Sequence, residues 1–196
     1  MHRVIITLGS NIDKERNLPA AVRLLAQAVD VVAVSPVYET VPVGLREQPH
    51  FLNAAALIET PLSATALKDG PLVDIERALR RERTSDKNAP RTIDLDIALV
   101  DDAVFDYTPA DGRPRRVPDP DLLRFPHSLV PVADLLPDMR HPETGEPLRA
   151  MATRLLANHT ADHGRVLWPR PDVVLERRNL SSDVNRLESK GHRSPD

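Results

Sequence analysis

Two aspartates separated by a single residue, Asp94 and Asp96, are the side chains whose type and spacing best suit metal chemistry. Apolar and polar residues alternate across 91–100, which predicts a strand with one face in the core. Residues two apart share a face of a strand, with about 6–7 Å between their Cα atoms. Such a pair favours a bound cation, and Mg²⁺ is usually held by one or two carboxylates together with substrate phosphates. The alternative is a solvated edge strand whose polar residues face water.

Basic residues gather just before this strand. Arg81 and Arg83 lie at the end of a predicted helix and in the loop after it, and Arg91 stands at the strand entrance. The planar guanidinium group binds phosphate in a bidentate manner. Cations beside a magnesium site are typical of phosphoryl transfer, in which catalysis depends mainly on positioning and charge neutralisation. The alternative is a solvated helix end with Glu–Arg pairs.

Two further segments predict a pocket for a flat ligand. Segment 40–44 is a loop that contains proline and glycine, and Phe51 and Asn53 follow shortly after it. Loop backbone groups and an asparagine amide can recognise the donor and acceptor edge of a heterocycle, and Phe51 can stack on its face. Taken alone, Phe51 is also consistent with an ordinary core residue.

Composition excludes several other classes of protein. The chain has 196 residues, a net charge of −3 and no cysteine, so we expect a cytoplasmic protein without a general affinity for nucleic acid. Its longest apolar runs are too short to cross a membrane. The Gly-Ser-Asn segment at 9–11 is neither a P-loop nor a dinucleotide fingerprint, and the histidines form no metal-binding pair.

The elements around the aspartates follow the order βαββαβ. Hydrophobic periodicity predicts strands at 3–8, 30–39, 51–60 and 91–100, and helices at 17–28 and 71–82, with Gly70-Pro71 breaking any earlier helix. This order indicates an α+β, ferredoxin-like fold, with an antiparallel sheet and both helices on one face. The odd residues 93, 95, 97 and 99 would face these helices. The two aspartates, and therefore the active site, would lie on the other face.

The chain after residue 100 is less regular. We expect a short strand at 104–107, a proline-rich loop at 108–121, a helix or strand at 129–136 and a closing helix at 148–156. Residues 1–160 then form one domain, and 170–196 a polar tail without fixed structure.

With these pieces assembled, the chain resembles the 6-hydroxymethyl-7,8-dihydropterin pyrophosphokinase family. Four motifs carry the resemblance in the family's order, at 8–11, 35–44, 48–54 and 90–97, and the last, Pro-Arg-Thr-Ile-Asp-Leu-Asp-Ile, is the most specific. The resemblance covers roughly residues 3–158. It implies transfer of pyrophosphate from ATP to the pterin hydroxymethyl group with release of AMP, assisted by two Mg²⁺ ions.

The resemblance also implies roles for individual residues. Asp94 and Asp96 would ligate both metal ions, and with Arg81 and Arg91 they form the expected catalytic set. The residues expected to bind ATP are Glu76, Arg81, Arg83, Arg91 and, at the position of a family histidine, Asp119. The residues expected to bind the pterin are Thr40, Val43, Phe51, Asn53 and, as the second stacking ring, His127.

The main departures from the family lie at residues 119–127. Asp119 replaces a histidine on the ATP side, Phe125 replaces an arginine, and His127 replaces an aromatic ring. Loss of a charge-assisted contact costs about 1.5–3 kcal/mol, although Arg124 could substitute for the missing arginine. We therefore keep two hypotheses: a working, monomeric pyrophosphokinase with ATP and pterin as its small-molecule partners, and a divergent paralogue that binds pterin or nucleotide without this activity.

Overall fold

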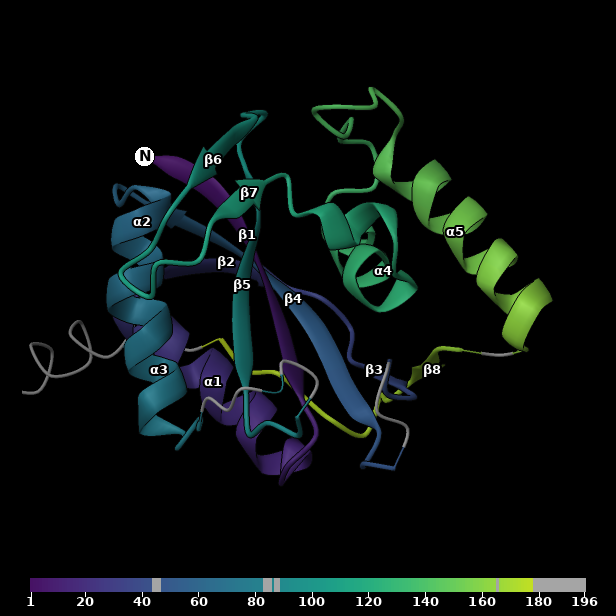
Figure 1. Cartoon of the computed structure of the whole chain (residues 1–196), viewed down its shortest axis with the longest axis horizontal. Helices are drawn as coiled ribbons and strands as arrows, with labels where there is room; N and C mark the ends of the chain where they lie inside the picture. Colours follow the sequence, from purple (N-terminus) through teal and green to yellow (C-terminus); the bar gives the residue numbers. More distant parts are fainter. Residues whose placement is uncertain (44–46, 83–85, 87–88, 165, 178–196) are drawn as a thin grey trace, which may run out of the picture.

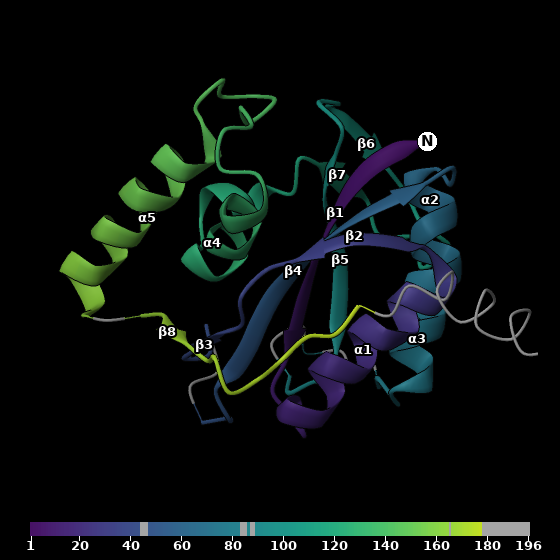
Figure 2. The same ribbon diagram turned by 180° about the vertical axis from the view of Figure 1, so that it is seen from behind.

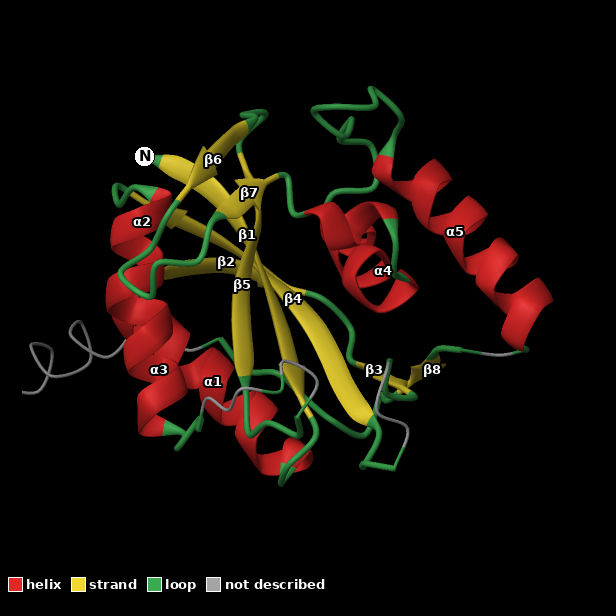
Figure 3. Ribbon diagram, viewed as in Figure 1, coloured by secondary structure: helices red, strands yellow, loops and turns green. Residues whose placement is uncertain are grey.

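The computed structural model describes residues 1–43, 47–82, 86, 89–164 and 166–177. Its centre is a six-stranded antiparallel sheet in the order β5-β1-β4-β3-β8, with β2 also paired to β4 (Figures 1 and 3). The strands are β1 (His2–Ser10), β2 (Asp30–Val34), β3 (Tyr38–Thr40), β4 (Phe51–Thr60), β5 (Asp94–Val100) and β8 (Trp168–Pro169). The order of elements and the antiparallel pairing confirm the predicted α+β, ferredoxin-like core.

Helices on one face of the sheet form the larger core. Helix α1 (Lys14–Ala28) buries its apolar stripe there, together with the helical segment that precedes β5. The even-numbered residues of β1 and β4, such as Val4 and Ala56, point into this core. Burial of this continuous apolar surface is the main force that holds the helices on the sheet.

The opposite face is half covered, which the sequence analysis did not predict. Helix α4 (Pro126–Leu135) packs on it and α5 (Leu148–His163) packs against α4, and their apolar residues share a second core with Ile5 and Leu57 of the sheet (Figures 1 and 2). Along the same face, β1 continues from Ile5 to Thr7 and Gly9, and β4 from Leu57 to Asn53. Since these later positions line a cavity, apolar residues anchor α4 and α5 at one end of the face and leave the other end for the site.

A β-bulge in β5 corrects the predicted strand alternation. Ile5 of β1 pairs with Leu99 but Ile6 pairs with Ile97, so Ala98 is an extra residue on β5. Leu95 and Ile97 therefore face α1 as predicted, whereas Leu99 packs in the second core. The prediction that Leu99 shares their face is wrong because the bulge reverses the alternation after residue 97.

The helix before β5 begins earlier and ends earlier than predicted. It runs without interruption through α2 (Ala64–Leu67), a π-helical turn (Lys68–Leu72) and α3 (Val73–Ala78). The predicted break at Gly70-Pro71 is wrong, because the wider π turn accommodates the proline within the helix. The predicted start at residue 71 is therefore seven residues too late, and the helix ends at Ala78 rather than at residue 82.

Other boundaries differ in smaller ways. The strand predicted at 30–39 is divided into β2 and β3 by Ser35, Pro36 and Val37, and the strand predicted at 91–100 begins at Asp94. The short strand after residue 100 is present as β6 (Phe105–Tyr107), paired with β7 (Arg115–Val117), which lies in the predicted loop. Of the two options left open at 129–136, the structure has the helix α4.

The C-terminal segment is ordered further than predicted. Strand β8 pairs with β3, and the chain then runs beside α1 (Figure 2), where Val173 is buried in the larger core. The Arg170 guanidinium donates to the Glu39 carboxylate at 2.5 Å. The expectation of an unstructured tail from residue 170 is therefore wrong for residues 170–177, and residues 178–196 lie outside the described part of the chain. Within the described residues, no helix is both long and apolar enough to cross a membrane.

Candidate active site

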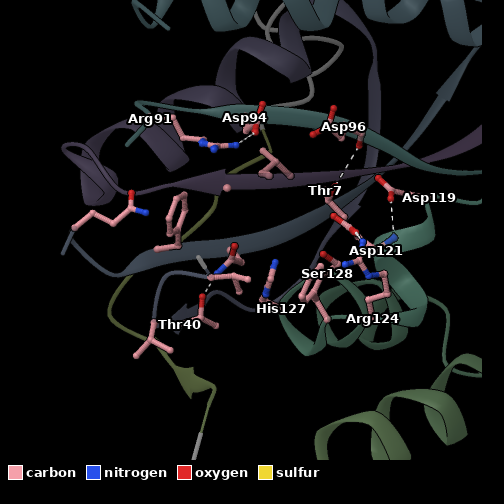
Figure 4. Close-up of a pocket in the computed structure, with 18 residues that line it drawn as sticks. Thr7, Thr40, Arg91, Asp94, Asp96, Asp119, Asp121, Arg124, His127 and Ser128 are labelled. Carbon is pink, nitrogen blue, oxygen red and sulfur yellow. Dashed lines mark hydrogen bonds and ion pairs between the residues drawn. The ribbon is translucent and has the colours of Figure 1, made fainter. Parts of the chain in front are cut away.

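A cavity of about 560 Å³ opens at the uncovered end of the second sheet face. Strand β5 supplies one side, β1 and β4 the floor, and the segment from Asp119 to Ser128 the opposite wall (Figure 4). Its volume is that of an ordinary small-molecule site, and charged side chains are concentrated on the β5 side and on the opposite wall.

Asp94 and Asp96 both line this cavity from β5, as the strand alternation predicts. The Arg91 guanidinium forms an ion pair with Asp94, and Asp96 Oδ1 accepts hydrogen bonds from Lys68 Nζ at 3.1 Å and Arg115 Nη1 at 3.4 Å. Burial and the charge of Asp96 raise the pKa of Asp94, while Arg91 opposes the rise. A divalent cation placed beside both carboxylates would remove this repulsion.

The loop at residues 9–12 positions Arg91. The Asn11 side-chain carbonyl accepts the Arg91 N–H at 2.7 Å, and the Asn11 and Ile12 N–H groups donate to the Arg91 carbonyl at 3.0 and 3.1 Å. Asn11 Nδ2 also donates to Gln48 Oε1 at 2.9 Å, and Ser10 Oγ donates to the Thr92 carbonyl at 2.6 Å. Gly9-Ser10-Asn11 therefore joins the start of β5 to the pocket loop, a role that the sequence analysis missed.

Four of the predicted pterin residues, Thr40, Val43, Phe51 and Asn53, line the same cavity. Asn53 Nδ2 donates to Thr40 Oγ1 at 2.8 Å, which fixes the amide. The Arg91 guanidinium carbon lies 5.8 Å from the centre of the Phe51 ring. An aromatic face, an oriented amide and a cation therefore lie within one site.

The opposite wall contains the departures at residues 119–127. Asp119 caps a short 3₁₀ helix (Pro120–Leu123), where its Oδ1 accepts the Asp121 N–H at 2.9 Å. The Phe125 and His127 rings are stacked, with their centres 5.2 Å apart, and the Arg124 guanidinium lies 5.0 Å from the centre of the Phe125 ring. Asp119, Asp121, Arg124, Phe125 and His127 all line the cavity. Arg124 is therefore a positively charged residue on this wall.

Two groups on this wall have displaced pKa values. Burial raises the pKa of Asp119 to about 6, helped by the charges of Asp96 and Asp121. Burial lowers the pKa of His127 to about 4, so its ring is neutral at physiological pH. The wall is therefore anionic at Asp119 and uncharged at His127 near neutral pH.

Two of the predicted ATP residues, Glu76 and Arg81, are outside the cavity lining. Glu76 is 3% exposed and lies beneath β5, where Oε1 accepts Lys68 Nζ at 3.3 Å and the Leu95 N–H at 3.1 Å. Arg81, just beyond α3, donates to the Glu82 carbonyl at 2.6 Å and is outside the cavity lining. Arg83 lies outside the described residues. Glu76 is therefore outside the cavity lining, and its part in ATP binding stays a prediction.

Lys68 and Arg115 are site-associated residues that the sequence analysis missed. Burial lowers the pKa of Lys68, but the carboxylates of Asp96 and Glu76 more than compensate and keep the ammonium charged. A signal was available, because Lys68 lies on the apolar stripe with Ala64, Leu72 and Ile75, where a charged residue needs partners. Arg115 carried no such signal, since it lies in a segment rich in proline and charge.

The carboxylates fit a hard divalent cation shared with a substrate. Among the described residues, no group of three or more histidine, cysteine, aspartate or glutamate side chains is placed to hold a metal by itself. Asp94 and Asp96 provide two oxygen-donor side chains on one wall of the cavity. Two carboxylates completed by phosphate oxygens and water match the usual coordination of Mg²⁺.

Comparisons with known proteins point to one family. The family profile described as 7,8-dihydro-6-hydroxymethylpterin-pyrophosphokinase (HPPK) matches residues 5–137. The chain is 36% identical over 148 residues to 2-amino-4-hydroxy-6-hydroxymethyldihydropteridine pyrophosphokinase of Pseudomonas aeruginosa, covering 73% of this chain and 86% of that protein. It is 41% identical over 133 residues to the protein of the same name from Bacillus subtilis, covering 66% of this chain and 75% of that protein.

Larger proteins contain a similar unit. The folic acid synthesis protein fol1 of Schizosaccharomyces pombe is 35% identical over 153 residues, which are 76% of this chain but 20% of that protein. The crystal structure of wild-type Plasmodium falciparum HPPK-DHPS superposes with a TM-score of 0.66 at 11% identity, covering 83% of this chain and 46% of that chain. This likeness supports the fold, and the chain spans less than half the length of these two proteins.

Proposed function

The chain belongs to the 7,8-dihydro-6-hydroxymethylpterin-pyrophosphokinase family, and from that premise we propose how its cavity carries out the family reaction. The reaction transfers pyrophosphate from ATP to the hydroxymethyl group of 6-hydroxymethyl-7,8-dihydropterin, a step of folate synthesis. The pterin hydroxyl oxygen attacks the β-phosphorus and releases its proton to water, the bond from that phosphorus to the α-phosphate oxygen breaks, and AMP leaves with that oxygen.

The observation that carries the proposal is the meeting of Asp94, Asp96 and Arg91 with the Asn53–Thr40 pair in one cavity. We propose that the aspartates hold two Mg²⁺ ions, which when bound neutralise the charge of the polyphosphate. Arg91, fixed through Asn11, binds the phosphates, with Arg81 and Arg83 contributing from the segment after α3.

The pterin end of the cavity supplies orientation rather than proton transfer. The Asn53 amide and the backbone at Thr40 and Val43 hydrogen-bond the pterin edge, and Phe51 stacks on one face of the ring. His127 provides a second stacking surface on the opposite wall. A substrate held in this way presents its hydroxymethyl oxygen to the phosphate at high effective concentration.

A second function follows from the wall at residues 119–127. The Asp119 carboxylate lines the cavity that would hold the polyphosphate, and its negative charge would repel the phosphates. Phe125 on the same wall has no positive charge to offset this repulsion. This observation favours a divergent paralogue that binds pterin and lacks transfer activity. Arg124 on the same wall and the intact β5 set favour the enzyme.

Release of AMP from ATP, Mg²⁺ and 6-hydroxymethyl-7,8-dihydropterin tests the two functions. We expect AMP formation that depends on both the pterin and Mg²⁺ and stops on addition of EDTA. Asp96→Asn should abolish turnover and leave the circular dichroism spectrum unchanged, while Asp102→Asn, at an exposed carboxylate outside the cavity, should retain activity. Pterin binding without AMP above background, even at high protein concentration, would favour the paralogue, and an active Asp96→Asn would refute the metal assignment.

We further propose that the protein acts as a monomer in the cytoplasm. The absence of cysteine is consistent with a reducing compartment. Light scattering should give a mass near 21.8 kDa, and a dimeric mass would refute this part of the proposal.

A further inference from the structure

We propose that Lys68 is a positioning residue for Asp96: a buried ammonium, brought under β5 by the π-helical turn, that fixes the carboxylate on the cavity wall and thereby sets the affinity of the site for metal. This inference rests on the proposed function, because it assumes that Asp96 is a metal ligand. It adds a role for a residue that lies outside the cavity itself.

The contacts of Lys68 connect the helix core to the site. Lys68 is 1% exposed, and Nζ donates to Asp96 Oδ1 at 3.1 Å, to Glu76 Oε1 at 3.3 Å and to the Leu95 carbonyl. Of these three partners, Asp96 is the one that lines the cavity. The ammonium therefore touches the proposed metal ligand from the buried side of the strand.

The π turn explains how Lys68 and Glu76 come to share these contacts. In a regular α-helix, residues eight apart are separated by about 80° around the axis. The π turn at Lys68–Leu72 takes up roughly one extra residue, which reduces the offset to about 20°. Both side chains then reach Leu95, Lys68 at its carbonyl and Glu76 at its N–H.

Burial makes this arrangement rigid. An ammonium removed from water needs several oxygen partners, and each contact of Lys68 fixes one of them in return. Arg115 holds the same Asp96 oxygen from another direction, at 3.4 Å. Outer hydrogen bonds of this kind orient metal-binding carboxylates, and their loss typically weakens metal affinity about 10–100-fold.

The double variant Lys68→Met/Glu76→Gln isolates this role. It removes one positive and one negative charge, so the net charge near Asp96 is unchanged, and the amide oxygen of the introduced glutamine can still accept the Leu95 N–H. Mn²⁺ alone is titrated without nucleotide and followed by loss of the free-ion EPR signal. We expect affinity to fall by about tenfold, and the Mg²⁺ concentration for half-maximal AMP release to rise by a similar factor.

A matched control removes another ion pair away from the cavity. Arg170→Met/Glu39→Gln deletes the contact between the C-terminal segment and β3, where each side chain is 22% exposed. We expect a lower melting temperature with native Mn²⁺ affinity. If Lys68→Met prevents folding, Lys68→Gln/Glu76→Gln offers a side-chain amide to the Leu95 carbonyl and should show the same loss of affinity.

The outcomes separate the inference from the function on which it rests. Native Mn²⁺ affinity in a folded Lys68 double variant would overturn the role of Lys68 and leave the enzyme assignment intact. Native affinity in Asp96→Asn, or no Mn²⁺ binding by the native chain either alone or with a non-hydrolysable ATP analogue, would instead overturn the metal assignment. A loss of Mn²⁺ affinity that occurs in the Lys68 and Asp96 variants and not in the control supports both the role of Lys68 and the metal assignment.

Discussion

Replacing Asp119 with asparagine should raise the free energy of unfolding near neutral pH. Burial raises the pKa of this carboxyl from 3.8 to about 6, and the charges of Asp96 and Asp121 act in the same direction. The Asp121 N–H and Arg115 partly oppose them. Asparagine has nearly the same shape and can accept the same N–H, so the substitution removes the charge and keeps the cap of the 3₁₀ helix.

The size and sign of the effect follow from the two pKa values. The difference between about 6 in the fold and 3.8 in the unfolded chain corresponds to roughly 3 kcal/mol. Because the folded value is higher, this contribution to stability is fully present below 3.8 and is lost as the pH rises through 6. We expect the free energy of unfolding of Asp119→Asn to exceed that of the native protein by about 2–3 kcal/mol near neutral pH, and by only about 0.5 kcal/mol near pH 4.

His127 produces the opposite trend over the same range. Burial lowers its pKa from 6.5 to about 4, so its contribution to stability is lost as the pH falls through that interval. The two effects partly cancel in the native protein, whose own pH profile is therefore a poor test. Since His127 is present in both proteins, the difference between the native and variant profiles isolates Asp119.

Urea unfolding, monitored by circular dichroism with EDTA present, gives the free energy of unfolding at each pH from about 7 down to about 4. Asp102→Asn provides the control, because this carboxylate is exposed and lies outside the cavity. Its profile should parallel that of the native protein. Parallel profiles for Asp119→Asn, or a less stable variant near neutral pH, would refute burial of a charged carboxylate as the cause.

Three further substitutions test other parts of the fold and site. Ser10→Ala removes the 2.6 Å hydrogen bond to the Thr92 carbonyl and should lower the free energy of unfolding by about 1–3 kcal/mol; an unchanged urea midpoint would contradict this. Leu99→Ala should cost about 2–5 kcal/mol, since Leu99 is 1% exposed in the second core; a loss below about 1 kcal/mol would argue against that packing. Asn53→Ala removes the amide held by Thr40 and should weaken pterin binding about tenfold in a fluorescence titration, whereas native affinity would remove Asn53 from the pterin site.

Local periodicity explains what was predictable about the fold. Alternation through Ile93, Leu95 and Ile97 indicated a strand with Asp94 and Asp96 on its other face, because side-chain direction in a strand depends on neighbouring residues alone. Helical spacing and the order of elements then led to the ferredoxin-like core. Most of the residues expected at the site line one cavity. The four motifs at 8–11, 35–44, 48–54 and 90–97 lie at strand ends, and the sheet topology brings these ends together.

Features that depend on pairing between distant segments were not predictable in this way. The bulge at Ala98 exists because β5 must match β1, and it places Leu99 in a second core. The cover provided by α4 and α5 decides which end of the sheet face stays open.

The two proposed metal ligands, Asp94 and Asp96, show most clearly what depends on local sequence and what depends on tertiary structure. Its two carboxylates and their shared face were determined by the sequence, because strand geometry alone sets their spacing. Their surroundings were decided by the tertiary structure: Arg91 held by Asn11, Lys68 beneath Asp96 and Arg115 beside it. The two residues of each of these contacts are between 19 and 80 residues apart along the chain, and only the folded arrangement of helix, loop and strand brings them together.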